Sequence, residues 1–186
     1  MVRVRLFFAL QLSQEAKSRL RPVIEAARRA SGDGTSFTRP EQLHFTLAFL
    51  GEQPESALQS LAQAGEAVCA LPAFELAIAG AGAFPDRRRP HVLWLGVSEG
   101  GEHLCALAEK LCAALRERGF ALEERPFRPH LTIARIKRGG ADKMLRSAPE
   151  GELARMRAEE ICLVQSVLGS GGATHSVLRG FALEPK

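Results

Sequence analysis

Two stretches of this sequence repeat one pattern: RPEQLHFTLAFL at residues 39–50 and RPFRPHLTIARI at residues 125–136. Five of the twelve positions agree, so that Arg-Pro-x-x-x-His-x-Thr-x-Ala occurs twice, with an offset of 86 residues from His44 to His130. Alternation of polar and apolar residues predicts a β-strand for each copy. The offset is nearly half the chain, and if the two strands lie side by side about a pseudo-two-fold axis, their polar side chains converge on one cleft.

Each repeated strand should present an imidazole and a hydroxyl on one face, because residues two apart in a strand share a face. We expect His44 to project with Thr46, and His130 with Thr132. The opposite face should be buried. Its members are Phe45, Leu47 and Phe49 in the first copy and Leu131 and Ile133 in the second.

Two histidines that meet at one phosphate can hydrolyse a phosphodiester at neutral pH. A neutral imidazole takes a proton from the attacking water, and a protonated one gives a proton to the leaving alkoxide. The threonine hydroxyls can donate to the non-bridging phosphate oxygens. A single His-x-Thr is usually only a strand residue beside the core; the doubled pattern favours catalysis.

Arg135 is a candidate phosphate ligand, because a guanidinium binds phosphate through two parallel N–H groups. It lies five residues after His130. In a regular strand this odd offset puts the two side chains on opposite faces. The interpretation therefore requires the strand to bulge or to end before Arg135.

The remaining pattern predicts an α+β fold with mostly antiparallel sheets. Strands are expected over residues 2–10, 42–50, 73–80, 91–97 and 128–137, helices over 13–30, 54–70 and 102–118, and two strands joined by a Gly/Ser turn within 159–183. The polar stretch 138–157 shows no clear pattern. Because no segment has the composition of a flexible linker, residues 1–186 are expected to form a single domain.

Charge and cysteine spacing narrow the functional classes. The net charge of +4, from 25 basic and 21 acidic residues, is too small to predict nucleic-acid binding by itself. The run Arg87–Arg89 could steer RNA phosphates, or it could be an ordinary exposed loop. The four cysteines lack metal-ligand spacing, and no glycine fingerprint for a nucleotide is present. The N-terminal apolar run is too short to span a bilayer, so we expect a cytoplasmic protein.

The doubled motif and the segments around it resemble the two-histidine phosphoesterase superfamily. Within it, they are most similar to the RNA 2′,3′-cyclic phosphodiesterases, also called 2′-5′ RNA ligases (LigT-like). The similar segments are RLFFAL at 5–10, RPEQLHFTLAFLGE at 39–52, VLWLGV at 92–97, RPFRPHLTIAR at 125–135 and the closing SVLGSGGATHSVLRGFAL. The resemblance runs in order from residue 3 to about 183 and is weakest over 138–157.

This resemblance implies a bilobal α+β fold with pseudo-two-fold symmetry, in which two sheets surround a central cleft and the helices lie outside. The implied reaction is hydrolysis of an RNA-terminal 2′,3′-cyclic phosphate to a 2′-phosphomonoester by paired-histidine acid–base catalysis. The resemblance implies no cofactor and no metal. The expected partners are RNA ends, tRNA-like or other, or small cyclic nucleotides, with the chain acting as a monomer away from membranes.

The family's site residues carry over to catalytic His44 and His130 and to phosphate-binding Thr46, Thr132 and Arg135. The resemblance favours His44 as the acid towards O3′ and His130 as the base for water. It also implies that Phe8 lines the nucleoside. The family often has Tyr where this sequence has His175, so nucleoside contacts at that position are open.

Other functions remain compatible with the sequence. The same chemistry run in reverse would join a cyclic phosphate end to a 5′-hydroxyl. Small cyclic phosphates of nucleotide or ADP-ribose type are alternative substrates. A non-catalytic RNA-end-binding module is an alternative from a different class. A di-histidine metal hydrolase has little support, because neither His-x-Thr includes a carboxylate to complete a ligand set.

Overall fold

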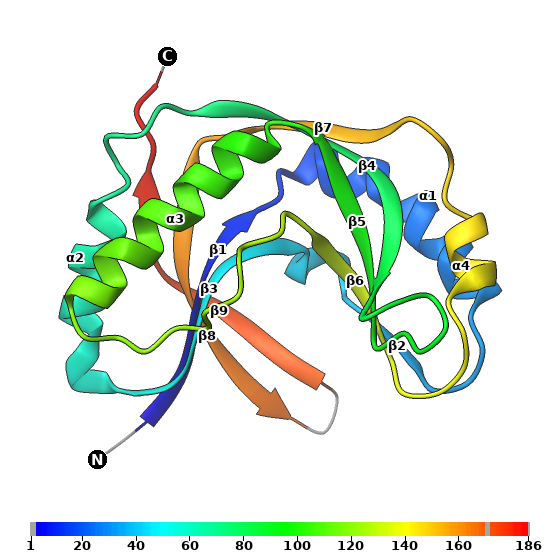
Figure 1. Cartoon of the computed structure of the whole chain (residues 1–186), viewed down its shortest axis with the longest axis horizontal. Helices are drawn as coiled ribbons and strands as arrows, with labels where there is room; N and C mark the ends of the chain where they lie inside the picture. Colours follow the sequence, from blue (N-terminus) through cyan, green and yellow to red (C-terminus); the bar gives the residue numbers. More distant parts are fainter. Residues whose placement is uncertain (1–2, 170–171, 186) are drawn as a thin grey trace.

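Two antiparallel β-sheets form the framework of the protein, as the computed structural model shows for residues 3–169 and 172–185 (Figure 1). The first sheet has the order β3-β1-β8-β9, with bounds His44–Pro54, Arg3–Gln11, Glu160–Gly169 and Gly172–Ala182. The second has the order β2-β6-β5-β4-β7, with bounds Thr35–Phe37, Leu131–Ile136, Val92–Glu99, Phe74–Phe84 and Glu152–Ala158. The predicted α+β class with antiparallel sheets is confirmed.

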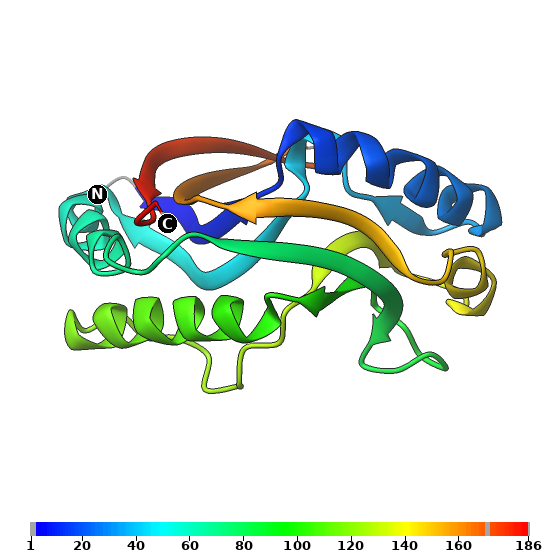
Figure 2. The same ribbon diagram turned by 90° about the horizontal axis from the view of Figure 1, so that it is seen from above.

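The helices cover the outer sides of the sheets. They are α1 (Gln14–Ala30), α2 (Leu58–Glu66), α3 (Gly101–Glu117) and the short α4 (Asp142–Arg146). Ser13 is the N-cap of α1, since its Oγ accepts from Ala16 N–H at 3.1 Å. Helix α1 follows a strand of the first sheet but packs on β7 of the second, and α3 follows β5 of the second sheet and packs on β3 of the first. Figure 2 shows these two helices on opposite sides of the molecule.

The two halves repeat one connectivity. In the first, β1 is followed by α1 and, after the short β2, by β3, which pairs antiparallel with β1; in the second, β5 is followed by α3 and β6, which pairs antiparallel with β5. The neighbours continue the correspondence, because β8 and then β9 lie beyond β1, as β4 and then β7 lie beyond β5. The repeated His-Thr strands, β3 and β6, thus occupy equivalent positions in the two sheets.

A β-bulge follows the threonine in both strands. In β3, Thr46 pairs with Ala9 and Ala48 with Phe8, which leaves Leu47 as the extra residue. In β6, Thr132 pairs with Trp94 and Ala134 with Leu93, which leaves Ile133 as the extra residue. Each bulge lets two consecutive apolar residues face the core and reverses the alternation beyond them. For this reason the prediction that Phe49 is buried is wrong: its side chain is 41% exposed.

Two strands were not predicted. The short β2 pairs with β6, and β7 pairs with β4 inside the stretch that lacked a clear pattern. The C-terminal hairpin of β8 and β9 was predicted, although residues 170 and 171 of its Gly/Ser turn lie outside the described residues. Helix α2 is shorter than predicted, because a 3₁₀ turn occupies Glu55–Ala57.

One hydrophobic cluster contains buried residues from both sheets and from all four helices, which is compatible with a single domain. Trp94, on the other face of β5, packs against Phe84 with 5.2 Å between ring centroids. Its ring lies over Gly82, the residue with which it pairs on β4. Because Trp94 also pairs with Thr132, this close approach supports the strand that carries the second motif.

A methyl group at Gly82 would overlap the Trp94 ring, so we predict that Gly82→Ala lowers the free energy of unfolding by about 1–3 kcal/mol through overpacking. Denaturant unfolding followed by the fluorescence of Trp94, the single tryptophan, measures the change. Gly32→Ala is the control, because a Cβ there meets nothing within 4 Å. Equal stabilities of the two variants would contradict the packing argument.

Candidate active site

His44 is held at the first position of β3 by two hydrogen bonds. Its Nδ1 lies 2.6 Å from the carbonyl oxygen of Gln42, and its Nε2 lies 3.0 Å from Thr46 Oγ1. Because a carbonyl only accepts, Nδ1 carries the proton in the neutral ring. Nε2 is then the acceptor of the Thr46 hydroxyl and the nitrogen available for proton transfer.

His130 repeats the same arrangement in the second half. It directly precedes β6, and its Nδ1 lies 2.7 Å from the carbonyl oxygen of Arg128, again two residues back in the chain. The carbonyl fixes the same tautomer, so Nε2 again carries the lone pair of the neutral ring. The ring of His130 meets the ring of Phe84 edge-on at 5.1 Å.

The bulge in β6 places Arg135 on the same face as Thr132. Thr132 pairs with Trp94 and Arg135 with Val92, two residues apart on β5, and paired residues of adjacent strands share a face. Arg135 is exposed there. The condition stated from the sequence, that the strand bulge before Arg135, is therefore met.

His44 is part of a cluster of three rings with Phe7 and His175. Ring centroids are 4.9 Å apart for Phe7 and His44, 5.0 Å for Phe7 and His175, and 5.3 Å for the two histidines. Gln42 Nε2 donates to the carbonyl oxygen of Ala173 at 2.7 Å, which ties the segment before His44 to the strand of His175. The structure thus places His175 beside a candidate catalytic residue.

Phe8 does not line this site. Its side chain is 0% exposed and packs against Phe181 at 5.9 Å on the core side of β1. The prediction for Phe8 is wrong, because Phe8 faces the core, whereas Phe7 pairs with Phe49 and shares the face of His44 and Thr46. Phe7 and Phe49 are the ring residues on this face that the sequence argument missed. Because two apolar residues are adjacent at Phe7-Phe8 and at Leu47-Ala48, the sequence does not indicate which side chains face the core and which share the face of His44.

Burial lowers the pKa of His44 from 6.5 to about 4. The hydrogen bond to Gln42 raises the pKa and so opposes the burial, whereas the charges of His175 and Lys17 lower it further. Burial also lowers the pKa of His175. His44 is therefore neutral at pH 7 in the free protein, with a lone pair on Nε2.

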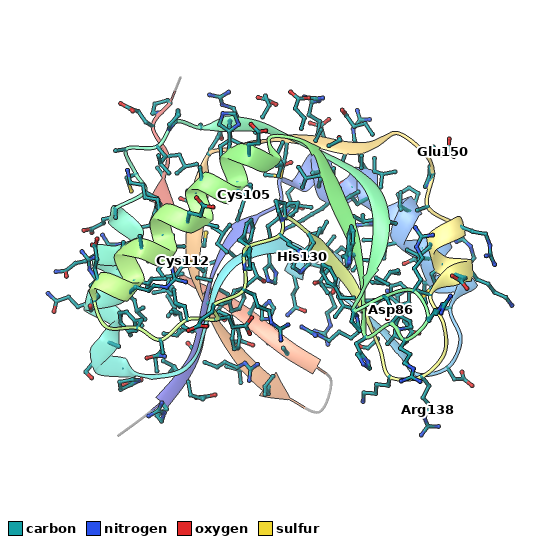
Figure 3. All side chains as sticks on the ribbon, in the orientation of Figure 1. Asp86, Cys105, Cys112, His130, Arg138 and Glu150 are labelled. Atoms are coloured by element: carbon teal, nitrogen blue, oxygen red, sulfur yellow. The ribbon has the colours of Figure 1, made fainter. Side chains whose placement is uncertain are left out.

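The two motif strands approach one another where the sheets meet, with Cα atoms of β3 and β6 within 8 Å. Thr38, six residues before His44, donates from its backbone N–H to Ile133 O at 2.9 Å and from Oγ1 to Thr132 O at 3.2 Å. These bonds join the chain that leads into β3 to the strand that follows His130. Figure 3 shows His130 near the middle of the molecule, on the segment that leads into β6.

Neither a metal cluster nor a membrane span is found in the part of the chain that the structure describes. Among residues 3–169 and 172–185, no three His, Cys, Asp or Glu side chains are grouped to hold a metal ion. Within the same ranges, no helix is both long and apolar enough to cross a bilayer.

Comparison of the sequence with family models and with known proteins shows the family of this chain. The model of the 2′-5′ RNA ligase superfamily matches residues 15–169. The chain belongs to this superfamily. A relative named RNA 2′,3′-cyclic phosphodiesterase from Archaeoglobus fulgidus is 32% identical over 180 residues, which cover 96% of this chain and 99% of the relative. One of the same name from Thermus thermophilus is 34% identical and covers 97% and 90% of the two chains.

Solved structures of superfamily members have the same fold. TT0787 of Thermus thermophilus matches with a TM-score of 0.82 and 30% identity, over 98% of this chain and 99% of the other. E. coli LigT complexed with 3′-AMP matches with a TM-score of 0.78 and 25% identity, over the same shares of the two chains. The resemblance seen in the sequence is thereby confirmed for the family and the fold.

We predict that an NMR titration of the free protein finds the His44 ring neutral above about pH 5, with a pKa near 4. The pKa of His44 is about 4 in the folded protein and 6.5 for an unburied histidine, as in the unfolded chain. The neutral buried ring therefore contributes to the free energy of unfolding above pH 6.5, and this contribution is lost as the pH falls towards 4. That loss should be about 3 kcal/mol larger in the wild type than in His44→Gln. An ordinary pKa near 6.5 in the folded protein would overturn this account of the site.

Proposed function

We propose that this protein is an enzyme that hydrolyses RNA-terminal 2′,3′-cyclic phosphates to 2′-phosphomonoesters, with His44 and His130 as the acid–base pair. The observation that carries the proposal is the repeated hydrogen bond from Nδ1 to the carbonyl two residues back, which places the lone pair on Nε2 in both halves. Relatives that carry the name RNA 2′,3′-cyclic phosphodiesterase cover nearly the whole chain, which supports the substrate class.

In the proposed reaction, a water oxygen bonds to phosphorus while the bond from phosphorus to O3′ breaks. One Nε2 takes the proton that the water loses, and the other gives a proton to O3′, so the net change is the addition of one water. Thr46, Thr132 and Arg135 bind the non-bridging oxygens, where hydroxyl and guanidinium donors stabilise the developing charge. His175 is placed to contact the nucleoside, because it flanks His44 on the same face, whereas Phe7, at 3% exposure, packs against both rings.

The neutral state of His44 constrains the division of roles. The family resemblance gives His44 the role of acid, which requires a proton on Nε2. Burial removes that proton in the free protein at pH 7. An anionic phosphate bound beside the ring favours the charged imidazole. We therefore propose that His44 takes up a proton together with the substrate, while His130 accepts the proton of water.

The same groups could also catalyse the reverse reaction if a 5′-hydroxyl replaces water. Formation of a 2′-5′ bond would then need two RNA ends held together, because water at about 55 M competes for the cyclic phosphate. Both histidines come from one chain, so we propose that a monomer is sufficient. The structure of E. coli LigT with 3′-AMP shows that a relative binds a nucleotide and supports a nucleotide-sized ligand here.

Replacement of either histidine should abolish proton transfer. We predict that His44→Gln and His130→Gln each lower kcat on 2′,3′-cyclic AMP by about 10²–10⁴-fold. The wild-type protein should keep its full activity when a chelator is present. Phosphorus NMR of the product should show the 2′-phosphomonoester. His103→Gln, on the exposed side of α3, is the control. Near-normal turnover by both variants, or release of the 3′-isomer, would contradict the proposal.

Arg135 tests the role of the bulge. We predict that Arg135→Gln lowers kcat/KM for the cyclic mononucleotide by about 10- to 100-fold, because a charge-assisted bond to phosphate is lost. Arg138→Gln, three residues further on, should change it less than about twofold. A normal kcat/KM in Arg135→Gln would show that the guanidinium does not reach the phosphate.

A further inference from the structure

A basic surface lies beside the His130 half of the site. It consists of Arg87, Arg88, Arg89, Lys137 and Arg138, from the loop between β4 and β5 and from the end of β6. A backbone hydrogen bond joins the two segments: Ile136 N–H donates to His91 O at 2.9 Å. Figure 3 shows Asp86 and Arg138 on this side of the molecule.

The charges of the basic surface are available to a ligand. All five side chains are exposed, and none of them forms an ion pair within residues 3–169 and 172–185. The one acidic residue in the two segments, Asp86, accepts the backbone N–H groups of Arg88 and Arg89 at 2.7 and 3.0 Å. Its carboxylate therefore orders the loop, and these bonds hold its pKa below the usual value.

The basic surface is continuous with the site. Phe84, whose ring touches His130 at 5.1 Å, is the residue from which the Arg87–Arg89 loop departs. Phe84 pairs with Val92, and Val92 pairs with Arg135, so the proposed phosphate ligand lies in the row of residues nearest the loop. Positive charge thus extends outward from the position proposed for the cyclic phosphate.

We propose that the basic surface binds the phosphate backbone of the nucleotides that precede the cyclic end, and so favours RNA chains over mononucleotides. This inference rests on the proposed function. From His130 to Arg138 the strand path is about 25 Å at about 3.3 Å per residue, long enough for several nucleotides. Because basic residues act on phosphates regardless of base, the preference depends on chain length and salt rather than on sequence.

The test compares cyclic-phosphate substrates of one, two, four and eight nucleotides at 50 and 200 mM salt. In the wild type, kcat/KM should rise with length, and more steeply at low salt. In R88Q/R89Q/R138Q, kcat/KM for the octamer should fall by about 10- to 100-fold and its salt slope should become shallower by about 2. Turnover of the mononucleotide should be unchanged, because these side chains lie outside the catalytic groups.

The control K110Q/R116Q/R118Q removes equal charge from α3 and its C-cap residue, across the molecule from the basic surface (Figure 1), and should behave as the wild type. Three results would each overturn the inference. They are a wild-type kcat/KM that does not depend on substrate length, equal losses of kcat/KM in the two triple variants, and loss of mononucleotide turnover in R88Q/R89Q/R138Q. Fluorescence anisotropy with an uncleavable octamer ending in a 3′-phosphate separates the two proposals. Normal binding of this octamer by R88Q/R89Q/R138Q would refute the role of the basic surface, whether or not the protein turns over any substrate. Absence of turnover by the wild type would refute the proposed function instead.

Discussion

The arrangement of the site depends on one backbone constraint, the bulge that follows the threonine in β3 and in β6. A regular strand would put Thr46 and Phe49, or Thr132 and Arg135, on opposite faces. The bulged residues, Leu47 and Ile133, are absorbed into the core at 4% and 1% exposure, and the alternation is reversed beyond them. The alanine of the repeated motif then faces the core, which accounts for a small apolar residue at that position in both copies.

The second constraint is the burial of His44. Phe7 and His175 pack against the ring, and Thr46 and Gln42 occupy its two nitrogens. Burial favours the neutral ring, and the carbonyl of Gln42 fixes which nitrogen carries the lone pair. His130 has the same carbonyl partner but meets only Phe84 among the described rings, so equivalent backbone positions surround the two imidazoles differently.

Most of the architecture could be predicted from the sequence, because long apolar periods mark β1, α1, α3 and the C-terminal hairpin. The motif histidines could be identified because the pattern is repeated, and a repeat can be recognised without knowing how the strands pair. Phe8 was wrongly preferred to Phe7, and Phe49 was expected in the core, since a one-residue bulge changes the face of a side chain without changing composition. Strand β7 was missed although Ala154, Met156 and Ala158 alternate with arginines at 155 and 157; surrounding polar residues obscured this pattern.

The two halves share a backbone plan but have diverged in the chemistry of their open faces. The equivalent position after each bulge holds Phe49 in the first half and Arg135 in the second. In the first sheet, Phe49, Phe7, Val164 and Val177 form one apolar row across four strands, exposed at its ends and buried at its centre. In the second, the corresponding row holds Arg135 and leads to the Arg87–Arg89 loop. A nucleotide has an apolar base at one end and a charged phosphate at the other, so a symmetric scaffold can bind it only once its two halves differ in this way.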